Sequence, residues 1–335
     1  KEAERVNNTQ KSRDKLLVKV AHMYYIEGLS QKEIAERIFV SRSNVSRLLK
    51  TGREKGIVEI RINHPSHIFL RLESEIKNRF GLDEVFVISS GQSSNDTLVE
   101  LGKTAARCLE SNLENGMLVG LSWGRSLYYT VEAFRPTRRD GVEVVQLLGG
   151  SGARDINTDG FELARKLARA LNARCHFLQV SLVVRNKNVR DILMQESDIM
   201  GPLQKGKRTD LAIVGVGSNN PETSAMVRSG YLTAAESEEL AKQGVVGDIC
   251  GYQLDINGNV CQVELNERIV GVSPHDIKRI PKVIGVAAGA DKAPVLLGAL
   301  RGGYINILVT DESAALGLLN IEVGSTEGKS LYDLF

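Results

Sequence analysis

The sequence predicts an α/β protein in which a small helical domain precedes a larger domain built on a mostly parallel β-sheet. Two observations predict the larger domain: beyond Gly81, short β-branched runs alternate with helical patterns, and nearly every run ends in glycine. A third predicts the smaller one, because three helical patterns follow one another closely before residue 62. At 335 residues, the chain is long enough for two domains of about 150 residues each.

Basic residues concentrate at the start of the chain. Residues 1–62 hold 14 Lys and Arg against 8 Asp and Glu, a net charge of +6, whereas the other 273 residues hold 29 against 33, a net charge of −4. A basic segment on a mildly acidic body is typical of a domain that binds a polyanion. A solvated helix face is the alternative, and charge alone does not decide between the two.

Three helices are expected in the first domain. Apolar residues recur at three- and four-residue steps over residues 14–28, which predicts the first helix. Ser30 and Glu33 have the spacing of a capping box, so the second helix is expected over residues 30–38. A third follows over residues 41–52 after a short turn. This succession predicts a helix-turn-helix.

The outer face of the third helix carries side-chain types that contact base edges and phosphates. A plain three-helix bundle with a polar outer face is the alternative. Phe39 occupies the turn position where glycine is usual, so the turn is expected to be strained or different in shape. The expected DNA contacts are Gln31, Ser41, Arg42, Ser43, Asn44, Ser46, Arg47 and Lys50.

Residues that follow the third helix suggest a wing and a connection. Residues 56–62 alternate as a strand, and apolar residues every four positions over 68–80 predict an amphipathic helix. The expected domains are a winged helix-turn-helix DNA-binding domain over 1–62, a linker and coupling helix over 63–81, an effector-binding and oligomerisation domain over 82–320, and a tail over 321–335.

Strands of the larger domain are read from six apolar runs. Amphipathic helices, such as those over residues 96–113 and 159–171, separate them, which indicates a parallel sheet covered on both faces. The expected strands cover residues 85–89, 117–122, 142–148, 210–216, 282–288 and 305–310.

Four strands end in glycine-rich segments, over residues 120–126, 147–152, 215–218 and 286–292. Glycine lets backbone N–H groups converge where the next helix begins, which makes an anion cradle, and several such loops on one edge form a crevice. For any single loop, a glycine that merely makes a turn is the alternative. The four loops together favour a small phosphorylated or polyhydroxylated ligand, helped by Arg125, Ser151, Asp248 and Lys292.

Other classes of protein are disfavoured. No stretch of about 18 uninterrupted apolar residues occurs, so no membrane span is expected. The four cysteines are far apart without a CxxC pair, which favours free thiols in the cytoplasm over disulfides or a zinc site. Neither a metal nor a cofactor is expected.

Several motifs resemble the SorC family of sugar-responsive bacterial transcription regulators. The likeness runs from about Asp14 to Leu319 and includes GLSQKEIAERIFVSRSNVSRLLK, GLSWGRS, LLGGSG, DLAIVGVGS, RSGYL, GDICGYQLDINGN and LNERIVGVS. Its most specific part is GVAAGADKAPVLLGALRGGYINILVTDESAA. The resemblance implies an effector domain related to sugar-phosphate isomerases, with the ligand at the carboxyl ends of the strands.

The resemblance also assigns partners and site residues. It implies operator DNA, a sugar, sugar phosphate or polyol effector, and a homotetramer built as a dimer of dimers. Asp248 of GDICGY and Lys292 of GADKA match effector-contacting positions, the GGSG loop matches a phosphate-binding segment, and Arg268 fits its motif. The expected effector site comprises Ser122, Gly124, Arg125, Gly149, Gly150, Ser151, Gly152, Asp248, Arg268 and Lys292.

Two enzyme interpretations are alternatives to this regulator. The segment GLSWG is a literal GxSxG between a strand and a helix, and Asp248 and His275 follow Ser122 in the order of a hydrolase triad. A sugar-phosphate isomerase with a fused DNA-binding domain would use a carboxylate base such as Asp248. The interpretation that accounts for both halves of the chain is a regulator without catalytic residues.

Overall fold

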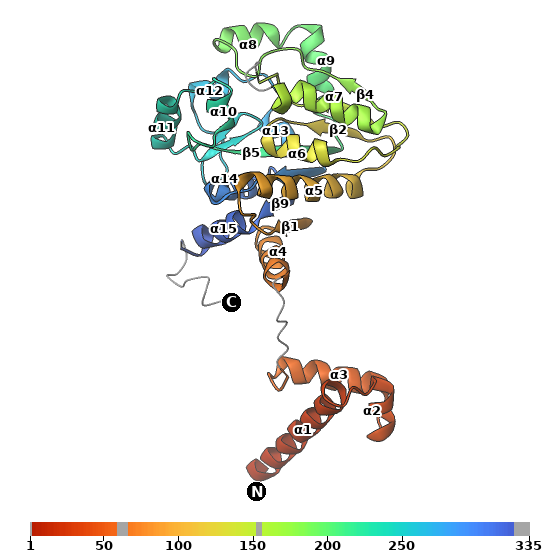
Figure 1. Ribbon diagram of the computed structural model, residues 1–335. Helices are drawn as coiled ribbons and strands as arrows, with labels where there is room; N and C mark the ends of the chain where they lie inside the picture. The colour runs from red at the N-terminus through yellow and green to blue at the C-terminus, as the bar shows by residue number, and fades with distance from the viewer. Residues whose placement is uncertain (1, 59–65, 152–155, 325–335) are drawn as a thin grey trace. The chain divides into compact units, whose positions relative to one another are not determined.

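The computed structural model describes residues 2–58, 66–151 and 156–324, and the chain divides into a unit of residues 1–64 and a unit of residues 65–335. Three helices form the first unit (Figure 1). Their shared core consists of Val20, Ile34, Ala35, Val45 and Leu49. The helices are α1 (Glu2–Tyr25), α2 (Gln31–Arg37) and α3 (Arg42–Glu54).

The predicted helix-turn-helix is confirmed. Ser30 caps α2 with the expected capping box: its Oγ accepts from the Glu33 amide at 3.3 Å, and its own amide donates to Glu33 Oε2 at 2.8 Å. Ser41 caps α3 by accepting from the Asn44 amide at 3.2 Å. Helix α1 begins at Glu2 rather than at Asp14, so it is longer than the apolar spacing of the sequence predicts.

The predicted wing and linker lie largely outside the described residues, which omit 59–65. Helix α4 (Ser66–Phe80) follows and belongs to the second unit, where Leu72 and Ile76 are fully buried in the core. The apolar stripe predicted over 68–80 thus packs on the body of the second unit, and its role in coupling stays a prediction. Of the predicted tail, residues 325–335 also lie outside the described residues.

A parallel sheet organises the second unit. Its strands run in the order β1-β9-β8-β5-β2-β3-β4, each parallel to its neighbour. An antiparallel hairpin of β6 (Gly247–Ile249) and β7 (Tyr252–Leu254) pairs with the end of β5. The parallel strands are β1 (Glu84–Ile88), β2 (Leu118–Leu121), β3 (Glu143–Gln146), β4 (Arg174–His176), β5 (Leu211–Ser218), β8 (Lys282–Val286) and β9 (Ile307–Asp311).

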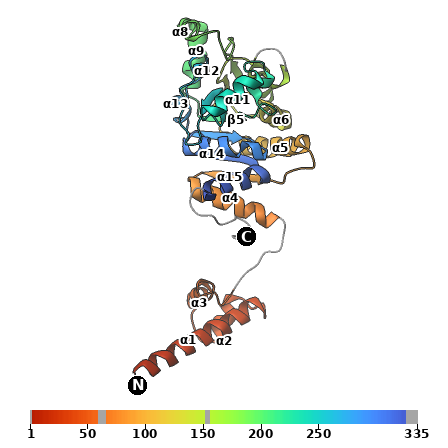
Figure 2. The same cartoon turned by 90° about the vertical axis from the view of Figure 1, so that its left-hand side faces the viewer.

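Helices cover both faces of this sheet, as predicted (Figures 1 and 2). Leu211 and Ile213 of β5 face one apolar core, whereas Ala212 and Val214 face the other, because side chains alternate along a strand. The first core is completed by α5 (Ser94–Asn112), α6 (Arg125–Ala133) and α7 (Gly160–Leu171). The second is completed by α4, α9 (Ser197–Gly206), α14 (Ala293–Arg301) and α15 (Glu312–Gly324).

Shorter helices lie in the connections between the strands. They are α8 (Lys187–Leu193), α10 (Ala225–Arg228), α11 (Ala234–Lys242), α12 (Glu264–Glu267) and α13 (Pro274–Ile277), with 3₁₀ turns over Ile156–Thr158 and Ala290–Lys292. Within the described residues, no helix is long and apolar enough to cross a membrane.

The edge strand β1 is covered by a side chain of α4. Glu73 Oε1 accepts a hydrogen bond from the outward-facing Val87 amide at 2.9 Å. Burial raises the pKa of Glu73, and the Val87 amide opposes that rise. One backbone donor at the edge of the sheet is thereby satisfied within the chain.

The strand order places a topological switch point between β2 and β5. The chain leaves β2 toward β3 and β4 on one side, whereas β5 lies on the other side of β2 and leads on to β8. Connections that depart in opposite directions open a crevice at the carboxyl ends of two neighbouring strands. This edge of the sheet is therefore where a ligand is expected.

Candidate functional site

Helix α3 exposes the side chains that the sequence analysis assigned to DNA. Val45 and Leu49 are buried, so the opposite face is directed to solvent. Arg47 is exposed, and its Nη2 donates to Asn44 Oδ1 at 2.8 Å. Ser41, Arg42, Ser43, Ser46 and Lys50 are exposed as well, whereas Asn44 and, on α2, Gln31 are half-buried.

The turn between α2 and α3 contains the strained residue that was expected. Phe39 has a φ of 54°, in the left-handed region, and its side chain is 94% exposed. A non-glycine residue in this region carries a steric cost of about 1–2 kcal/mol. The turn therefore keeps the usual backbone shape with an unfavourable residue, rather than changing shape to suit it.

A pocket lies at the carboxyl ends of β2, β5 and β8, at the switch point. It holds about 560 Å³ of empty space that is partly open to solvent. Gly124, Arg125 and Ser126 begin α6 there, and Gly124 has a φ of 110° that glycine adopts readily. The lining residues are Leu98, Trp123, Gly124, Arg125, Ser126, Gly215, Val216, Gly217, Thr223, Ala225, Arg228, Asp248, Ala288 and Lys292.

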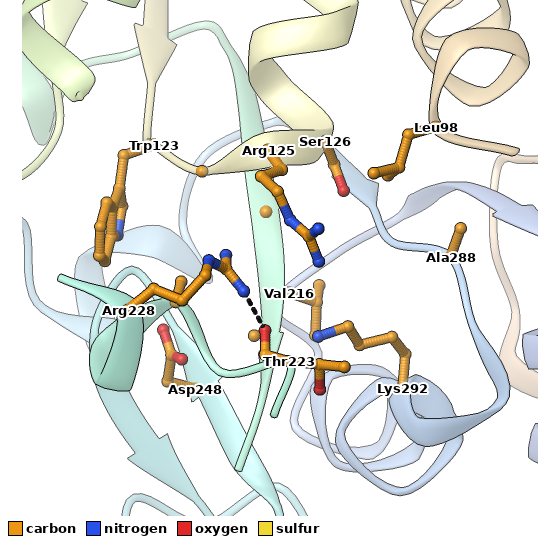
Figure 3. A pocket seen from close by; sticks show the side chains of 14 residues that line it. Leu98, Trp123, Arg125, Ser126, Val216, Thr223, Arg228, Asp248, Ala288 and Lys292 are labelled. Atoms are coloured by element: carbon orange, nitrogen blue, oxygen red, sulfur yellow. Dashed lines mark hydrogen bonds between the residues drawn. The ribbon is translucent and has the colours of Figure 1, made fainter. Parts of the chain in front are cut away.

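Three cationic side chains reach into this pocket. Arg125 comes from the start of α6, Arg228 from the end of α10 and Lys292 from the turn before α14 (Figure 3). Arg228 Nη1 donates to the Thr223 carbonyl at 2.6 Å. Because α6 has no side-chain cap, its first amides add to the positive field. The pocket is therefore suited to an anionic group.

Asp248 is the carboxylate of the pocket, and the β6–β7 hairpin positions it. The two-residue turn of Cys250 and Gly251 has positive φ at both positions, 49° and 83°, and the Gly251 amide donates to Asp248 Oδ2 at 3.0 Å. A Cβ on Gly217 would lie 2.2 Å from Asp248 Oδ1, so only glycine leaves room for this side chain. Burial raises the pKa of Asp248 to about 6, opposed by the Gly251 amide and by Lys292.

Lys292 is mostly buried among charged groups. Burial lowers the pKa of Lys292, Asp291 and Asp248 oppose that effect, and Arg228 and Arg125 reinforce it. Its Nζ lies 3.7 Å from Asp291 Oδ2, which also accepts from Thr223 Oγ1 at 2.5 Å. Buried cations with shifted pKa values in a pocket are typical of a binding site.

Gly124, Arg125, Asp248 and Lys292, which the sequence analysis assigned to the effector site, are thus brought together. Ser122 is buried beside them, but its Oγ accepts from the Gly215 amide at 3.0 Å and does not line the pocket. Its role is to fix the end of β2 against β5. Its engaged hydroxyl, together with the exposed position of His275 on α13, gives no support to a nucleophile at Ser122.

The GGSG loop does not have the geometry predicted for it. The Gly149 amide donates to the Val270 carbonyl, the Gly150 amide to the Val180 carbonyl, and the Ser151 amide and Oγ to Asp159 Oδ2. These amides continue the bonding beyond β3 and are already occupied, so they are not an anion cradle. None of the three residues lines the pocket, and Gly152 lies outside the described residues.

Arg268 is also absent from the pocket lining. Its Nε donates to the Val184 carbonyl at 2.8 Å, where residues 183 and 269 form a β-bridge. Arg228, Thr223 and Trp123 line the pocket but were not predicted as site residues from the sequence. Arg228 belongs to the RSGYL motif, which was the available signal, and Trp123 belongs to GLSWGRS.

The described residues contain no group of three or more His, Cys, Asp or Glu side chains that could hold a metal ion. The donor set of the pocket, three cations with one buried carboxylate, suits a polar anion rather than a cation.

A helix-turn-helix unit joined to an α/β unit with a charged pocket at its switch point defines the class of ligand-responsive, DNA-binding regulators. Family models agree: the family described as "Putative sugar-binding domain" matches residues 65–320, and the MarR family matches residues 20–65.

Relatives extend along nearly the whole chain. The deoxyribonucleoside regulator of Bacillus subtilis is 33% identical, covering 92% of this chain and 99% of that protein, and the sorbitol operon regulator of Klebsiella pneumoniae is 34% identical, covering 91% and 98%. The crystal structure of the full-length sorbitol operon regulator SorC from Klebsiella pneumoniae superposes with a TM-score of 0.71 at 32% identity, covering 91% and 98%.

This chain belongs to the SorC family of sugar-responsive, DNA-binding transcription regulators. The matching relatives are regulators and not enzymes, so neither the hydrolase nor the isomerase interpretation holds.

Proposed function

We propose that this regulator senses a phosphorylated sugar in the pocket at the switch point, and that occupancy of the pocket controls operator binding. The observation that carries the proposal is the convergence of Arg125, Arg228 and Lys292 on one space beside the buried Asp248. The cations would hold the phosphate with the α6 N-terminus, and Asp248 would accept from sugar hydroxyls.

Charge supports a phosphorylated effector over a neutral one. Burial is the main cause that lowers the pKa of Lys292, and Arg228 and Arg125 add to it against Asp291 and Asp248, so keeping Lys292 charged has an electrostatic cost that a bound anion would reduce. A neutral sugar would leave that cost in place.

Control of DNA binding requires a difference between two states. A ligand with equal affinity for both arrangements of the DNA-binding units shifts nothing, so the effector must bind one arrangement more tightly. We propose that the protein acts as a homotetramer in the cytoplasm, with α3 of paired DNA-binding units placed on paired half-sites of the operator.

The test uses calorimetry and operator titration on the full chain. A thermal-shift screen first identifies a sugar phosphate that binds, since a hundredfold excess over Kd stabilises the native state by about 2.7 kcal/mol. Lys292→Ala and Asp248→Ala are then expected to lose binding of that sugar phosphate and the response of operator affinity to it. Both variants are expected to keep the parent's operator affinity when no effector is present.

Lys242→Ala is the matched control, because Lys242 is exposed on α11 and, within the described residues, forms an ion pair with Glu239 only. It removes one positive charge away from the pocket and should bind the sugar phosphate like the parent. If Lys292→Ala and Asp248→Ala also bind it like the parent, the effector site lies elsewhere.

A further inference from the structure

Trp123 is the single tryptophan of the sequence, and it lines the pocket. It lies directly after β2, where Ser122 binds the Gly215 amide and holds the strand end in place. The side chain belongs to the apolar core and is only 7% exposed, so its ring is held by packing. The indole is therefore a rigid wall of the pocket rather than a mobile side chain.

The indole N–H is a donor without an acceptor among the residues that the structure describes. The atom, Trp123 Nε1, is also not one of the fully buried polar atoms without a partner, so it stays accessible from the pocket. Buried tryptophans usually find an acceptor for this group. A donor held at the wall of a polar pocket is suited to an oxygen of a ligand.

Trp123 lies at the end of the pocket where Arg228 and Asp248 lie, whereas Leu98 and Ala288 line the other end (Figure 3). This end of the pocket therefore combines an aromatic side chain, which is apolar, with a carboxylate, which accepts hydrogen bonds. A sugar ring has both counterparts, because its C–H groups form an apolar face and its hydroxyls point outward from the rim.

We propose that Trp123 is the platform on which the ring of the effector packs, with the indole N–H, at the edge of the indole plane, donating to an exocyclic oxygen that extends past that edge. The site then selects a cyclic sugar phosphate over the open-chain sugar alcohol that carries the same phosphate. This inference rests on the proposed function and assigns the class of effector within it.

Selectivity for a ring has a physical reason. A ring presents its apolar face already formed, whereas an open-chain polyol must give up several bond rotations to present a comparable surface. The phosphate contacts at Arg125 and Lys292 would be the same for both ligands. The difference in affinity between them therefore reports the ring and not the phosphate, and its loss in a Trp123 variant would assign it to the platform.

The first experiment compares matched ligand pairs on the full-length protein: glucose 6-phosphate with sorbitol 6-phosphate, ribose 5-phosphate with ribitol 5-phosphate, and fructose 6-phosphate with mannitol 6-phosphate. In the pair containing the tightest ligand, the cyclic member is expected to bind about tenfold more tightly by calorimetry. It should also change the tryptophan emission, which reports Trp123 alone. Inorganic phosphate, as a control, should bind without changing the emission.

The second experiment varies the platform. Trp123→Leu is expected to lower the affinity for the cyclic ligand about tenfold and to remove the preference for this ligand over its open-chain counterpart. Trp123→Phe keeps an aromatic face but lacks the N–H. It is expected to lower the affinity for the cyclic ligand about threefold and to retain part of the preference for the ring. Thermal unfolding verifies that each variant is folded, and the conservative Phe variant keeps the test valid if the Leu variant is not.

Outcomes separate this inference from the proposed function. If Lys292→Ala loses the sugar phosphate while both Trp123 variants bind it like the parent, the platform is wrong and the effector site stands. A parent protein that prefers the open-chain member of the best pair also overturns the platform. If no ligand of the panel binds the parent, or if Lys292→Ala binds like the parent, the proposed function fails and this inference fails with it.

Discussion

Asp248 is a single residue whose burial in the pocket lowers the stability of the folded protein at neutral pH. An ordinary aspartic acid has a pKa near 3.8, whereas burial raises that of Asp248 to about 6. The folded protein therefore binds this proton more tightly than the unfolded chain does. The tighter proton binding therefore contributes to the free energy of unfolding. This contribution is complete below about pH 4 and is lost as the pH rises through 6, where the carboxyl must ionise inside the protein.

Replacing this carboxyl by an amide should remove the pH dependence. Asp248→Asn can still accept from the Gly251 amide, and it carries no charge to bury. We expect the variant to be more stable than the parent at pH 7.5 without effector, by up to about 3 kcal/mol for a shift of about two pKa units. Thermal unfolding at pH 4.5, 6 and 7.5 should show this advantage shrinking as the pH falls.

The exposed Asp83→Asn is the control for a change of net charge. An advantage of Asp248→Asn that stays the same at all three pH values would contradict the buried, ionised state of Asp248.

Phe39 is a second residue whose backbone conformation is costly. Its φ of 54° suits glycine, and its exposed side chain contributes little packing. Phe39→Gly should stabilise the first unit by about 1 kcal/mol, after allowance for the greater freedom of glycine in the unfolded chain. Slower hydrogen exchange of the α2–α3 segment is the expected observation, and unchanged or faster exchange would mean that Phe39 stabilises the turn in another way.

At the scale of elements, α3 should behave as a recognition helix. Arg47 is exposed, and within the described residues its side chain bonds only to Asn44 on the same helix, so it is available to a base edge. Arg47→Ala should weaken specific operator binding by about 1–3 kcal/mol and leave effector binding unchanged. A gel-shift titration at fixed salt measures this, with Lys242→Ala as the charge-matched control.

Equal operator affinities of Arg47→Ala and Lys242→Ala would argue against α3 as the element that reads the operator.

Elements were predictable from sequence where they are long and regular. All six apolar runs are strands, and the helices of the first unit were recognisable from caps and spacing. The strands β4, β6 and β7 were missed because three residues are too few to show a period. The β6–β7 hairpin also depends on Cys250 in a left-handed conformation, which composition does not indicate.

The site was predictable in part, for the same reason. Arg125 and Lys292 follow regular strands, so the rule that ligands bind at the carboxyl ends of strands predicts them at this edge of the sheet, where both line the pocket. Thr223 and Arg228 come from the segment between β5 and α11, which contains only the one-turn helix α10 and whose path only the structure reveals. The GGSG loop was misjudged because its glycines serve close packing: a Cβ on Gly149 would lie 2.6 Å from the Val180 carbonyl oxygen.

For the whole molecule, we expect an oligomer in solution. A single DNA-binding unit on a chain of net charge +2 makes few phosphate contacts, whereas paired units read paired half-sites. Light scattering at micromolar concentration should give about four times the chain mass of 36.7 kDa, or twice that mass for a stable dimer. A monomer both with and without DNA would exclude the proposed assembly.

The hydrogen bond between Glu73 and the edge strand β1 bears on where this chain can be cut to make a chimeric regulator. An effector module cut at residue 82 would lose α4, expose the Val87 amide and leave Leu82 and Val85 without Leu72 and Ile76 beside them. A bare strand edge of this kind invites pairing with another chain and aggregation. Chimeras that join another DNA-binding domain to this effector domain should therefore be fused before Ser66, so that α4 is kept together with the sheet whose edge it covers.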